Sequence, residues 1–480
     1  MLKNLLGDTV KYGIGNVITK FFSVLVVPII IAKNFSPDVF GEITIITTFV
    51  GLFTGLSFLG LDAAVGFYFF HGEENLRRNY LGTAFITRII IAVFFFTIFY
   101  IFSKYIADAQ FLLKDQSRYL LIILGAAIIP FDNCIAFFND LSRFLIKPVL
   151  FNIINLLKTV IYFSFILIFL SNNLTIEKIF LSLIISSLLP SLFLFFYYKE
   201  HLRFKINFYC LKKMLKYGIP LVPVTIMHWT INSVSRFILN NYAGLEETGI
   251  YSMMITISGI FMLITFSISL AYPPYAMNIA KKENAQVIFS RIFLYLLILL
   301  VPLAFYFWSI IDIIILLFSK PVYLIGENIV ILIVLQLILS LLYQCGGIGL
   351  TLKEKTIHFT IGYTISGFIT ILTSIFLCKY FGIFGAAVSV FLGNFIAVIY
   401  ILLKSQKFYP IPYNKVFIIS YTLILMIIVI FSLIMPNSNI FWNFIIRFFI
   451  GCVFMSIPFI FKIITINDIK IFLLPKKENN

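Results

Sequence analysis

The tetrapeptide Lys11-Tyr12-Gly13-Ile14, which opens the first long apolar stretch of the chain, recurs 205 residues later as Lys216-Tyr217-Gly218-Ile219. Each copy leads into six hydrophobic segments. Phe40-Gly41-Glu42-Ile43 follows the first copy, and Thr248-Gly249-Ile250-Tyr251 follows the second at nearly the same distance. An internal repeat in a membrane protein is typical of a transporter that is built from two lobes, with its substrate site between them.

The composition places this chain in a lipid bilayer. Of its 480 residues, 61% are hydrophobic and 12% are charged, whereas about 25% are charged in soluble domains. Apolar runs of about 20 residues recur along the whole length, and each can cross roughly 30 Å of hydrocarbon as a helix. The first run carries Lys11 and Lys20 and lacks a small-residue cleavage site, so we expect it to be a retained span. The sequence therefore predicts an all-α, polytopic membrane protein.

We expect about fourteen transmembrane helices, forming two six-helix lobes that are related by the repeat, and two further helices. The N-terminal lobe is predicted at residues 1–205 and the C-terminal lobe at 206–405, followed by two additional helices and a cytoplasmic tail at 406–480. The expected helices span residues 10–32, 42–62, 80–102, 119–138, 149–171, 178–198, 214–238, 250–271, 288–312, 328–350, 359–378, 384–403, 416–435 and 440–462.

The basic residues separate by side of the membrane. The N-terminus and every second connection carry 24 of the 36 Lys and Arg residues, and the other connections carry seven. Because excess Lys and Arg mark the cytoplasmic side, both termini of this multi-pass protein are predicted to be cytoplasmic. This bias and attraction to anionic membrane lipids account for the net charge of +16. No basic stretch is organised to read nucleic acid, so no nucleic-acid partner is expected.

Five basic residues remain inside the predicted spans: Lys20, Arg88, Lys158, Arg236 and Arg447. A charge near the bilayer centre costs about 2.5–3.5 kcal/mol and usually faces a cavity. Lys20, Arg88 and Lys158 lie deepest, whereas the other two lie toward the outer ends of their helices. For those two, the alternative is that the long side chain carries its charge to the headgroups.

A polar stripe follows the first helix, where the i, i+3, i+7, i+10 spacing places four residues on one face: Gly13, Asn16, Lys20 and Ser23. The seventh helix repeats this spacing with Thr225, His228, Asn232 and Ser235, beside Arg236. The repeat offset carries Lys20 onto Thr225 and Ser23 onto His228, so the two stripes correspond. The alternative is that these groups join helices by hydrogen bonds, with His228 in a packing role. Hydrogen bonding between helices does not explain why cations lie inside the spans, because the sequence shows few acidic partners for them.

Acidic residues are scarce in the predicted spans. Asp132, which follows Pro130 in the fourth helix, either pairs with a buried cation, carries a coupling proton or caps a turn broken by proline. The buried excess is therefore positive, and it suits an anionic passenger such as a phosphate or diphosphate better than a cationic drug. The five cysteines form no CxxC or Cys/His cluster, and catalytic motifs are missing, so we expect no metal, cofactor or enzymatic activity.

Five motifs have a recognisable order and spacing: FSPDVFGE at 35–42, KYGIPLVP at 216–223, TGIYS at 248–252, LTLKEKT at 350–356 and YFGIFGAA at 380–387. Together they resemble the polysaccharide (O-antigen or capsule type) flippases of the multidrug/oligosaccharidyl-lipid/polysaccharide exporter superfamily. The resemblance covers nearly the whole chain. One departure is Ser235-Arg236, which stands where the family commonly has an Asp-Arg pair near the end of the seventh helix.

The resemblance implies a passenger made of an oligosaccharide on a polyprenyl diphosphate, moved by alternating access and often driven by an ion gradient. We therefore predict a flippase for surface polysaccharide biosynthesis, with other polysaccharide-assembly proteins as candidate partners. Lys20, Arg88 and Lys158 would hold the diphosphate, with Arg236 at the outer end. The polar faces would bind sugar hydroxyls, and Asp132 is the candidate for ion coupling.

Three alternatives remain. A multidrug or cation antiporter of the same fold would need buried acids, of which Asp132 alone is well placed. A flippase for a peptidoglycan precursor fits the same physical arguments. A membrane glycosyltransferase or polymerase is expected to have a long catalytic external loop, but in the longest predicted external loop, 103–118, Asp108 and Asp115 form no organised site.

Overall fold

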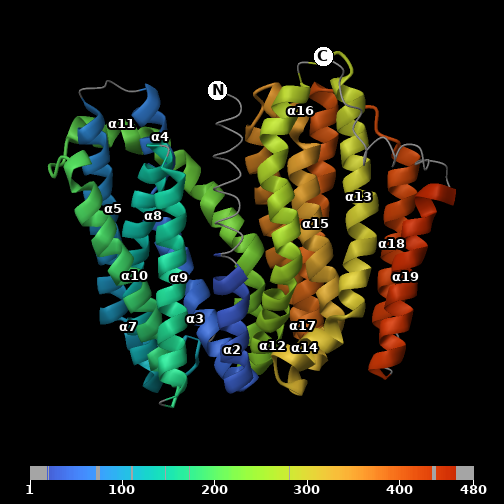
Figure 1. Ribbon diagram of the computed structural model, residues 1–480, viewed down its shortest axis with the longest axis horizontal. Helices are drawn as coiled ribbons and strands as arrows, with labels where there is room; N and C mark the ends of the chain where they lie inside the picture. The colour runs from blue at the N-terminus through green and yellow to red at the C-terminus, as the bar shows by residue number, and fades with distance from the viewer. Residues whose placement is uncertain are drawn as a thin grey trace. The chain divides into compact units, whose positions relative to one another are not determined.

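The computed structural model describes residues 21–71, 76–109, 112–145, 147–171, 173–280, 282–434 and 439–460, together with Thr19. Every element in these ranges is a helix (Figure 1). Ten helical segments in them are long and apolar enough to cross a membrane. The predicted fold class, an all-α polytopic membrane protein, is confirmed, whereas the count of fourteen helices stays a prediction.

The chain divides into two compact units: the first comprises Met1–Leu263 and Tyr363–Gly393, and the second comprises Ile264–Gly362 and Asn394–Asn480. The elements up to the first division are η1 (Phe21–Val26), α2 (Val27–Asn34), α3 (Pro37–Leu56), α4 (Leu61–His71), α5 (Arg77–Ile101), α6 (Ser103–Asp108), η3 (Gln116–Arg118), α7 (Tyr119–Ala126), α8 (Ile128–Phe144), α9 (Pro148–Leu170), α10 (Ile176–Tyr198), η4 (Lys199–His201), α11 (Phe208–Gly218), η5 (Ile219–Leu221) and α12 (Val222–Ile279). The later elements are α13 (Ala285–Ser309), α14 (Ile311–Phe318), η6 (Pro321–Ile329), α15 (Val330–Gly346), α16 (Ile348–Leu352), α17 (Ile357–Phe408), α18 (Lys415–Ile434) and α19 (Ile440–Ile460).

All three divisions between the units fall inside helical segments, one in α12 and two in α17. Each of these segments joins two helices at a glycine with a positive φ, which is 87° at Gly244 and 48° at Gly382. Glycine is suited to such a break because it has no Cβ. The Glu247 carboxylate accepts a hydrogen bond from the Ile383 N–H, 3.1 Å away, and so caps the helix that follows Gly382. The units follow spatial contacts and not the repeat, so the predicted lobes stay a prediction.

The core of the first unit gathers side chains from α4, α5, α8, α10 and α11. Tyr80, Phe138, Tyr198 and Met214 are almost fully buried in one cluster. Figure 1 shows α5, α8, α9 and α10 side by side, and direct contacts join these helices. The Phe138 and Tyr198 rings stack with centroids 5.7 Å apart. This packing fixes α5 and α9, which carry two of the predicted buried cations, Arg88 and Lys158.

A close crossing joins α3 to the second helix of α12. A Cβ on Gly41 would overlap the Leu245 carbonyl, and a Cβ on Gly249 would overlap the Pro37 carbonyl. Leu245 is four residues before Gly249, and Pro37 is four residues before Gly41. One turn further along, the Thr44 hydroxyl donates to the Ser252 hydroxyl, 3.1 Å away. The contact is therefore reciprocal, and it involves the two Gly-containing motifs that the sequence analysis matched.

Candidate functional site

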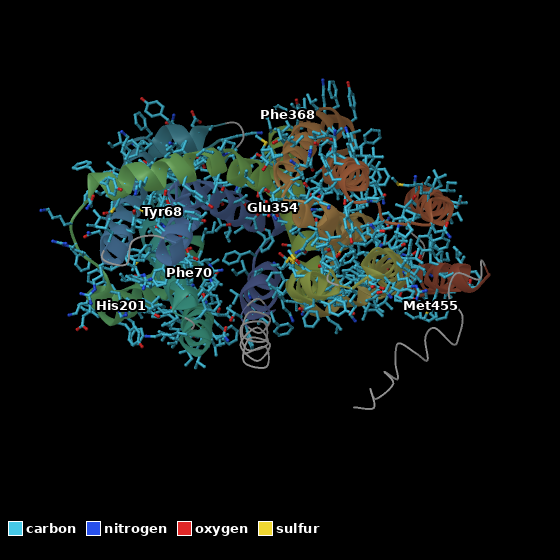
Figure 2. All side chains as sticks on the ribbon, turned by 90° about the horizontal axis from the view of Figure 1, so that it is seen from above. Tyr68, Phe70, His201, Glu354, Phe368 and Met455 are labelled. Atoms are coloured by element: carbon cyan, nitrogen blue, oxygen red, sulfur yellow. The ribbon has the colours of Figure 1, made fainter. Side chains whose placement is uncertain are left out.

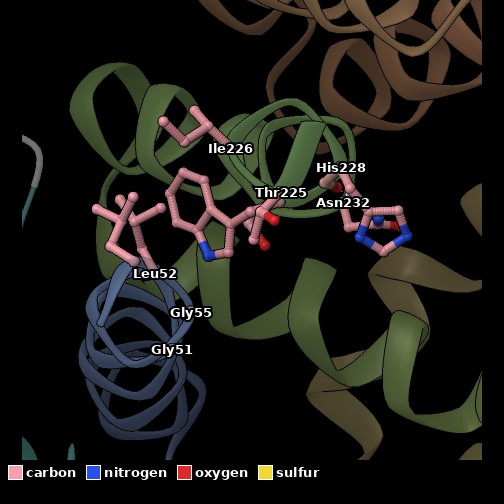
Figure 3. A pocket seen from close by; sticks show the side chains of 10 residues that line it. Gly51, Leu52, Gly55, Thr225, Ile226, His228 and Asn232 are labelled. Carbon is pink, nitrogen blue, oxygen red and sulfur yellow. Dashed lines mark hydrogen bonds between the residues drawn. The ribbon is translucent and has the colours of Figure 1, made fainter. Parts of the chain in front are cut away.

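An open pocket of about 340 Å³ lies between α3 and the first helix of α12. Three predicted site residues, Thr225, His228 and Asn232, line it with exposed side chains. Figure 3 shows them along α12, with Gly51 and Gly55 on the facing α3. The full lining is Gly51, Leu52, Gly55, Leu56, Thr225, Ile226, His228, Trp229, Asn232 and Ser233.

Two glycines on α3 leave room for this pocket. A Cβ added to Gly51 would meet nothing within 4 Å, and one added to Gly55 would meet only the Thr225 methyl group, at 3.6 Å. Residues four apart lie on the same side of a helix, so both glycines open the same face. Sequence reasoning did not single them out. The i, i+4 spacing of the two glycines can be read from the sequence. Whether it indicates a pocket or a close helix contact depends on which helix faces it.

Trp229 forms a fixed wall of the pocket and was also missed by the sequence analysis. Its indole N–H donates to the Thr48 carbonyl, 3.2 Å away. Its ring packs against Phe237, with centroids 5.6 Å apart. A tryptophan whose N–H is satisfied in this way offers a rigid apolar surface beside polar groups.

The polar side of the pocket is supported by a hydrogen bond within α12 and by one ring of α17. The Asn232 amide donates to the His228 carbonyl, 2.8 Å away. The His228 ring meets Tyr363 edge to face, with centroids 5.9 Å apart. Ring nitrogens, amide oxygens and hydroxyls in an open pocket can bind a ligand that is rich in hydroxyl groups.

Ser235 and Arg236 lie beyond this pocket, although they continue the predicted stripe. Ser235 is fully buried, with its hydroxyl 3.4 Å from the Tyr251 hydroxyl. The Arg236 guanidinium donates to the Thr48 hydroxyl, 3.0 Å away, while its Nε is buried without a hydrogen-bond partner in the described part of the chain. No carboxylate in the described ranges forms a salt bridge with Arg236. The Arg236 cation is therefore packed among helices whose described residues give it no acidic partner.

Arg88 is packed inside the first unit. Its side chain is 1% exposed, its Nε donates to the Asn133 side chain at 3.0 Å, and Asp140 lies 3.7 Å away. The guanidinium carbon also lies 4.2 Å from the centre of the Phe58 ring and 5.5 Å from that of Phe137. The adjoining void is too small for a water molecule. A ligand would have to displace these contacts, so the diphosphate-binding role of Arg88 stays a prediction.

Lys158 is paired but accessible. Its ammonium lies 2.5 Å from Asp132, and the Ser187 hydroxyl donates to the same carboxylate oxygen at 2.7 Å. The side chains of Lys158 and Asp132 are 29% and 31% exposed. Asp132 therefore pairs with a cation in this structure, which is one of the three roles the sequence left open. Lys158 and Arg88 bind consecutive residues of α8, whose side chains diverge by about 100°.

Arg447 decides one alternative and corrects one expectation from the sequence. Its side chain is buried and forms ion pairs with Asp312 and Glu327, both at 2.8 Å, so it does not reach the headgroups. The guanidinium also lies over the Trp308 ring, 4.4 Å from its centre. The expectation that the intramembrane cations have few acidic partners is wrong, because Arg88, Lys158 and Arg447 each lie beside a carboxylate.

Three predicted residues of the first helix cannot be placed in the site. Asn16 and Lys20 lie outside the described residues, as does the side chain of Ser23. Their roles stay predictions. Across the described ranges, no three His, Cys, Asp or Glu side chains are grouped so that they could hold a metal ion.

Comparison with solved structures defines the class of this fold. A lipid II flippase, MurJ, in an inward closed conformation matches with a TM-score of 0.73 at 17% identity, covering 94% of this chain and 99% of that one. A multidrug resistance MATE family transporter of the MOP superfamily, in an inward-facing conformation, matches with a TM-score of 0.59 at 13% identity, covering 81% and 94%. The Vibrio cholerae MATE transporter VcmN, in its bent form, gives 0.58 at 13% identity, covering 84% and 96%. The fold is thus similar to that of these three polytopic membrane proteins.

The family follows from the sequence itself. The family model described as "Polysaccharide biosynthesis protein" matches residues 30–320, which is more than half of the chain. The chain belongs to this family. A search of curated protein sequences finds no significant match.

Proposed function

We propose that this protein is a flippase, which carries a polyprenyl-diphosphate-linked oligosaccharide repeat unit across the bacterial cytoplasmic membrane by alternating access. Its product would serve surface polysaccharide biosynthesis, such as that of O-antigen, lipopolysaccharide or capsule. The polysaccharide biosynthesis family and the transporter fold support this proposal. It involves transport and no enzymatic step.

The pocket between α3 and α12 carries the proposal. Its polar groups are neutral and bind hydroxyls well, and the described lining contains no carboxylate. A binding site for cationic drugs is expected to hold an acid, so the lining favours a glycan over a drug. The Trp229 ring adds an apolar face on which the C–H groups of a sugar ring can pack.

The cations of the first unit would hold the diphosphate. Lys158 is partly exposed, and it would turn from Asp132 toward a phosphate oxygen. Asp132 would then be free to take up a proton or a small cation, which would couple transport to an ion gradient. Lys20, Arg88 and Arg236 remain proposed ligands of the diphosphate, with Arg236 next to the neutral polar face.

A second candidate is a flippase for a peptidoglycan precursor. It is favoured by the likeness to MurJ, which is described as a lipid II flippase. The two proposals share the mechanism and differ in the sugar. Cells that lack the gene distinguish them, because loss of surface polysaccharide with intact peptidoglycan supports the first proposal, and cell lysis supports the second.

The pocket can be tested by filling it. Gly51→Leu should place its side chain in open space, leave the fold intact and abolish export of the surface glycan. Val93→Leu is the control, because Val93 on α5 is 45% exposed and lines no part of the pocket. Surface glycan, lipid-linked intermediate and the amount of protein in the membrane are measured together. Normal glycan output from Gly51→Leu would rule out this pocket as the translocation site.

A further inference from the structure

Residues 199–218, which connect α10 to η5, combine positive charge with exposed aromatic rings. Six of these twenty residues are Lys or Arg, and Glu200 is the single acid. The side chains of Phe204, Phe208 and Tyr209 are 52%, 78% and 54% exposed. Large apolar rings that the protein itself leaves uncovered indicate a contact surface, especially where cations lie beside them.

The inner face of α11 packs against the core of the first unit. Cys210 and Met214 are fully buried in the core cluster. The Asn207 side chain accepts hydrogen bonds from the backbone N–H groups of Tyr209 and Cys210, at 3.0 and 3.2 Å, and so starts the helix. The Asn207 N–H donates to the Thr83 hydroxyl on α5, 3.0 Å away. The outer face of α11 is therefore presented by a rigid support.

That outer face mixes apolar and cationic groups along one line. Phe208, Lys212 and Lys216 are spaced four residues apart and are all exposed. Beside them, the Lys213 ammonium lies 4.3 Å from the centre of the Tyr209 ring. A helix with Lys residues and aromatic rings on its outer face is typical of one that lies in the plane of the membrane interface.

The position of α11 fits such an interface. It starts beside the first turns of α5, where the Asn207 N–H meets the Thr83 hydroxyl, and it ends at Gly218, which packs against Gly60 at the start of α4. Figure 2 labels Tyr68, Phe70 and His201 of this unit. Other cations at the same ends of the spans also lie over rings, and this pattern marks the boundary of the hydrocarbon. These pairs are Arg77 over Phe69 at 4.7 Å, Lys147 over Tyr197 at 5.0 Å and Lys199 over Phe196 at 5.7 Å.

We infer that the outer face of α11 binds anionic phospholipid headgroups, with Lys212, Lys213 and Lys216 on the phosphates and Phe208 inserted among the acyl chains. The occupant must be negative and must offer an apolar layer directly beside its charge. An anionic lipid leaflet meets both requirements, and it is continuous with the lipid around α5 and α10. A soluble acidic protein meets only the first. This surface is separate from the glycan pocket.

Tryptophan quenching in the full-length protein tests this inference. Phe208→Trp is introduced in a Trp442→Phe background, because Trp442 is 55% exposed and would respond to any lipid. The protein is placed in nanodiscs that contain brominated phosphatidylglycerol or brominated phosphatidylcholine. We expect stronger quenching by the anionic lipid at equal mole fraction, and loss of the difference at high salt.

Neutralising the lysines should remove the lipid preference. Lys212→Gln, Lys213→Gln and Lys216→Gln together should lower it at least tenfold, because each lysine near an anionic surface contributes about fivefold, or ~1 kcal/mol. The control neutralises Lys353, Lys355 and Lys404, which lie outside α11, in the second unit. Thermal melting checks that both variants are folded.

Two results would overturn the inference. Equal quenching by the two lipids shows that no anionic preference exists. Absence of quenching by either lipid shows that the α11 face meets water or another protein. Neither readout requires a glycan, so a failure of the proposed flippase activity leaves this test intact.

Discussion

Gly41 and Gly249 pack against each other's helices so closely that neither position has room for a methyl group. Substituting either glycine by alanine should therefore force the backbones of α3 and α12 apart. Overpacking of this kind costs about 1–3 kcal/mol. We expect Gly41→Ala and Gly249→Ala to lower the melting temperature of the purified protein.

Gly51→Ala is the matched control for this prediction. It lies on the same helix as Gly41, but its added Cβ meets open space, so its melting temperature should stay near or above that of the wild type. Equal destabilisation at Gly41 and Gly51 would show that the close crossing is not the cause of the loss, because helix propensity alone favours alanine at both positions.

Arg447→Met should destabilise the second unit strongly. It leaves the buried carboxylates of Asp312 and Glu327 without their cation, and breaking a buried ion pair in this way costs about 3–5 kcal/mol. Adding Glu327→Gln and Asp312→Asn to Arg447→Met should recover much of the loss, because the unpaired charges disappear. Thermal melting of the wild type, the single variant and the triple variant measures this. Phe449→Leu, at a 66% exposed position on α19, is the control.

The Lys158–Asp132 pair should matter more for transport than for stability. Both side chains are about one-third exposed, and pairs in contact with solvent contribute about 1 kcal/mol or less. Lys158→Met and Asp132→Asn should therefore reduce surface glycan output while changing the melting temperature little. A double-mutant cycle on both readouts separates the two effects. Large destabilisation with unchanged output from the stable fraction would assign the pair a structural role.

Arg236 offers the opposite test, because its guanidinium has no carboxylate partner among the described residues. Burying this cation costs free energy that no ion pair offsets. Arg236→Met should therefore keep or raise the melting temperature. If the proposed diphosphate role is right, the same variant loses glycan export, and Arg236→Lys retains part of it. A destabilised Arg236→Met protein would mean that the Thr48 contact is the main role of this side chain.

Much of the fold was predictable because hydrophobic runs and basic loops are properties of the sequence alone. The exposed faces of Thr225, His228 and Asn232 were also predictable, since helical periodicity places them together. Ser235 is ten residues from Thr225, about 15 Å along the helix, where different neighbours bury it. Periodicity defines a face but not the length over which that face stays open.

The partners of the buried cations were missed because of helix boundaries. The fourth helix was predicted to end at residue 138, whereas α8 continues to Phe144 and carries Asp140 to Arg88. Glu327 lies one residue before the predicted start of the tenth helix, inside η6. Errors of a few residues at helix ends thus placed two partner acids outside the membrane. The role of Gly51 needed knowledge of the facing helix, which no local pattern contains.

The late position of one segment of the first unit also affects when this protein can complete its packing. The first unit includes Tyr363–Gly393, and Tyr363 packs against His228. The ribosome must therefore add 130 residues after Leu263 before the first unit has all its helices, which takes roughly 6–26 s at bacterial and eukaryotic elongation rates of about 5–20 residues per second. During that interval, the helix that carries His228 lacks its contact with Tyr363, so the first unit completes its packing only late in synthesis.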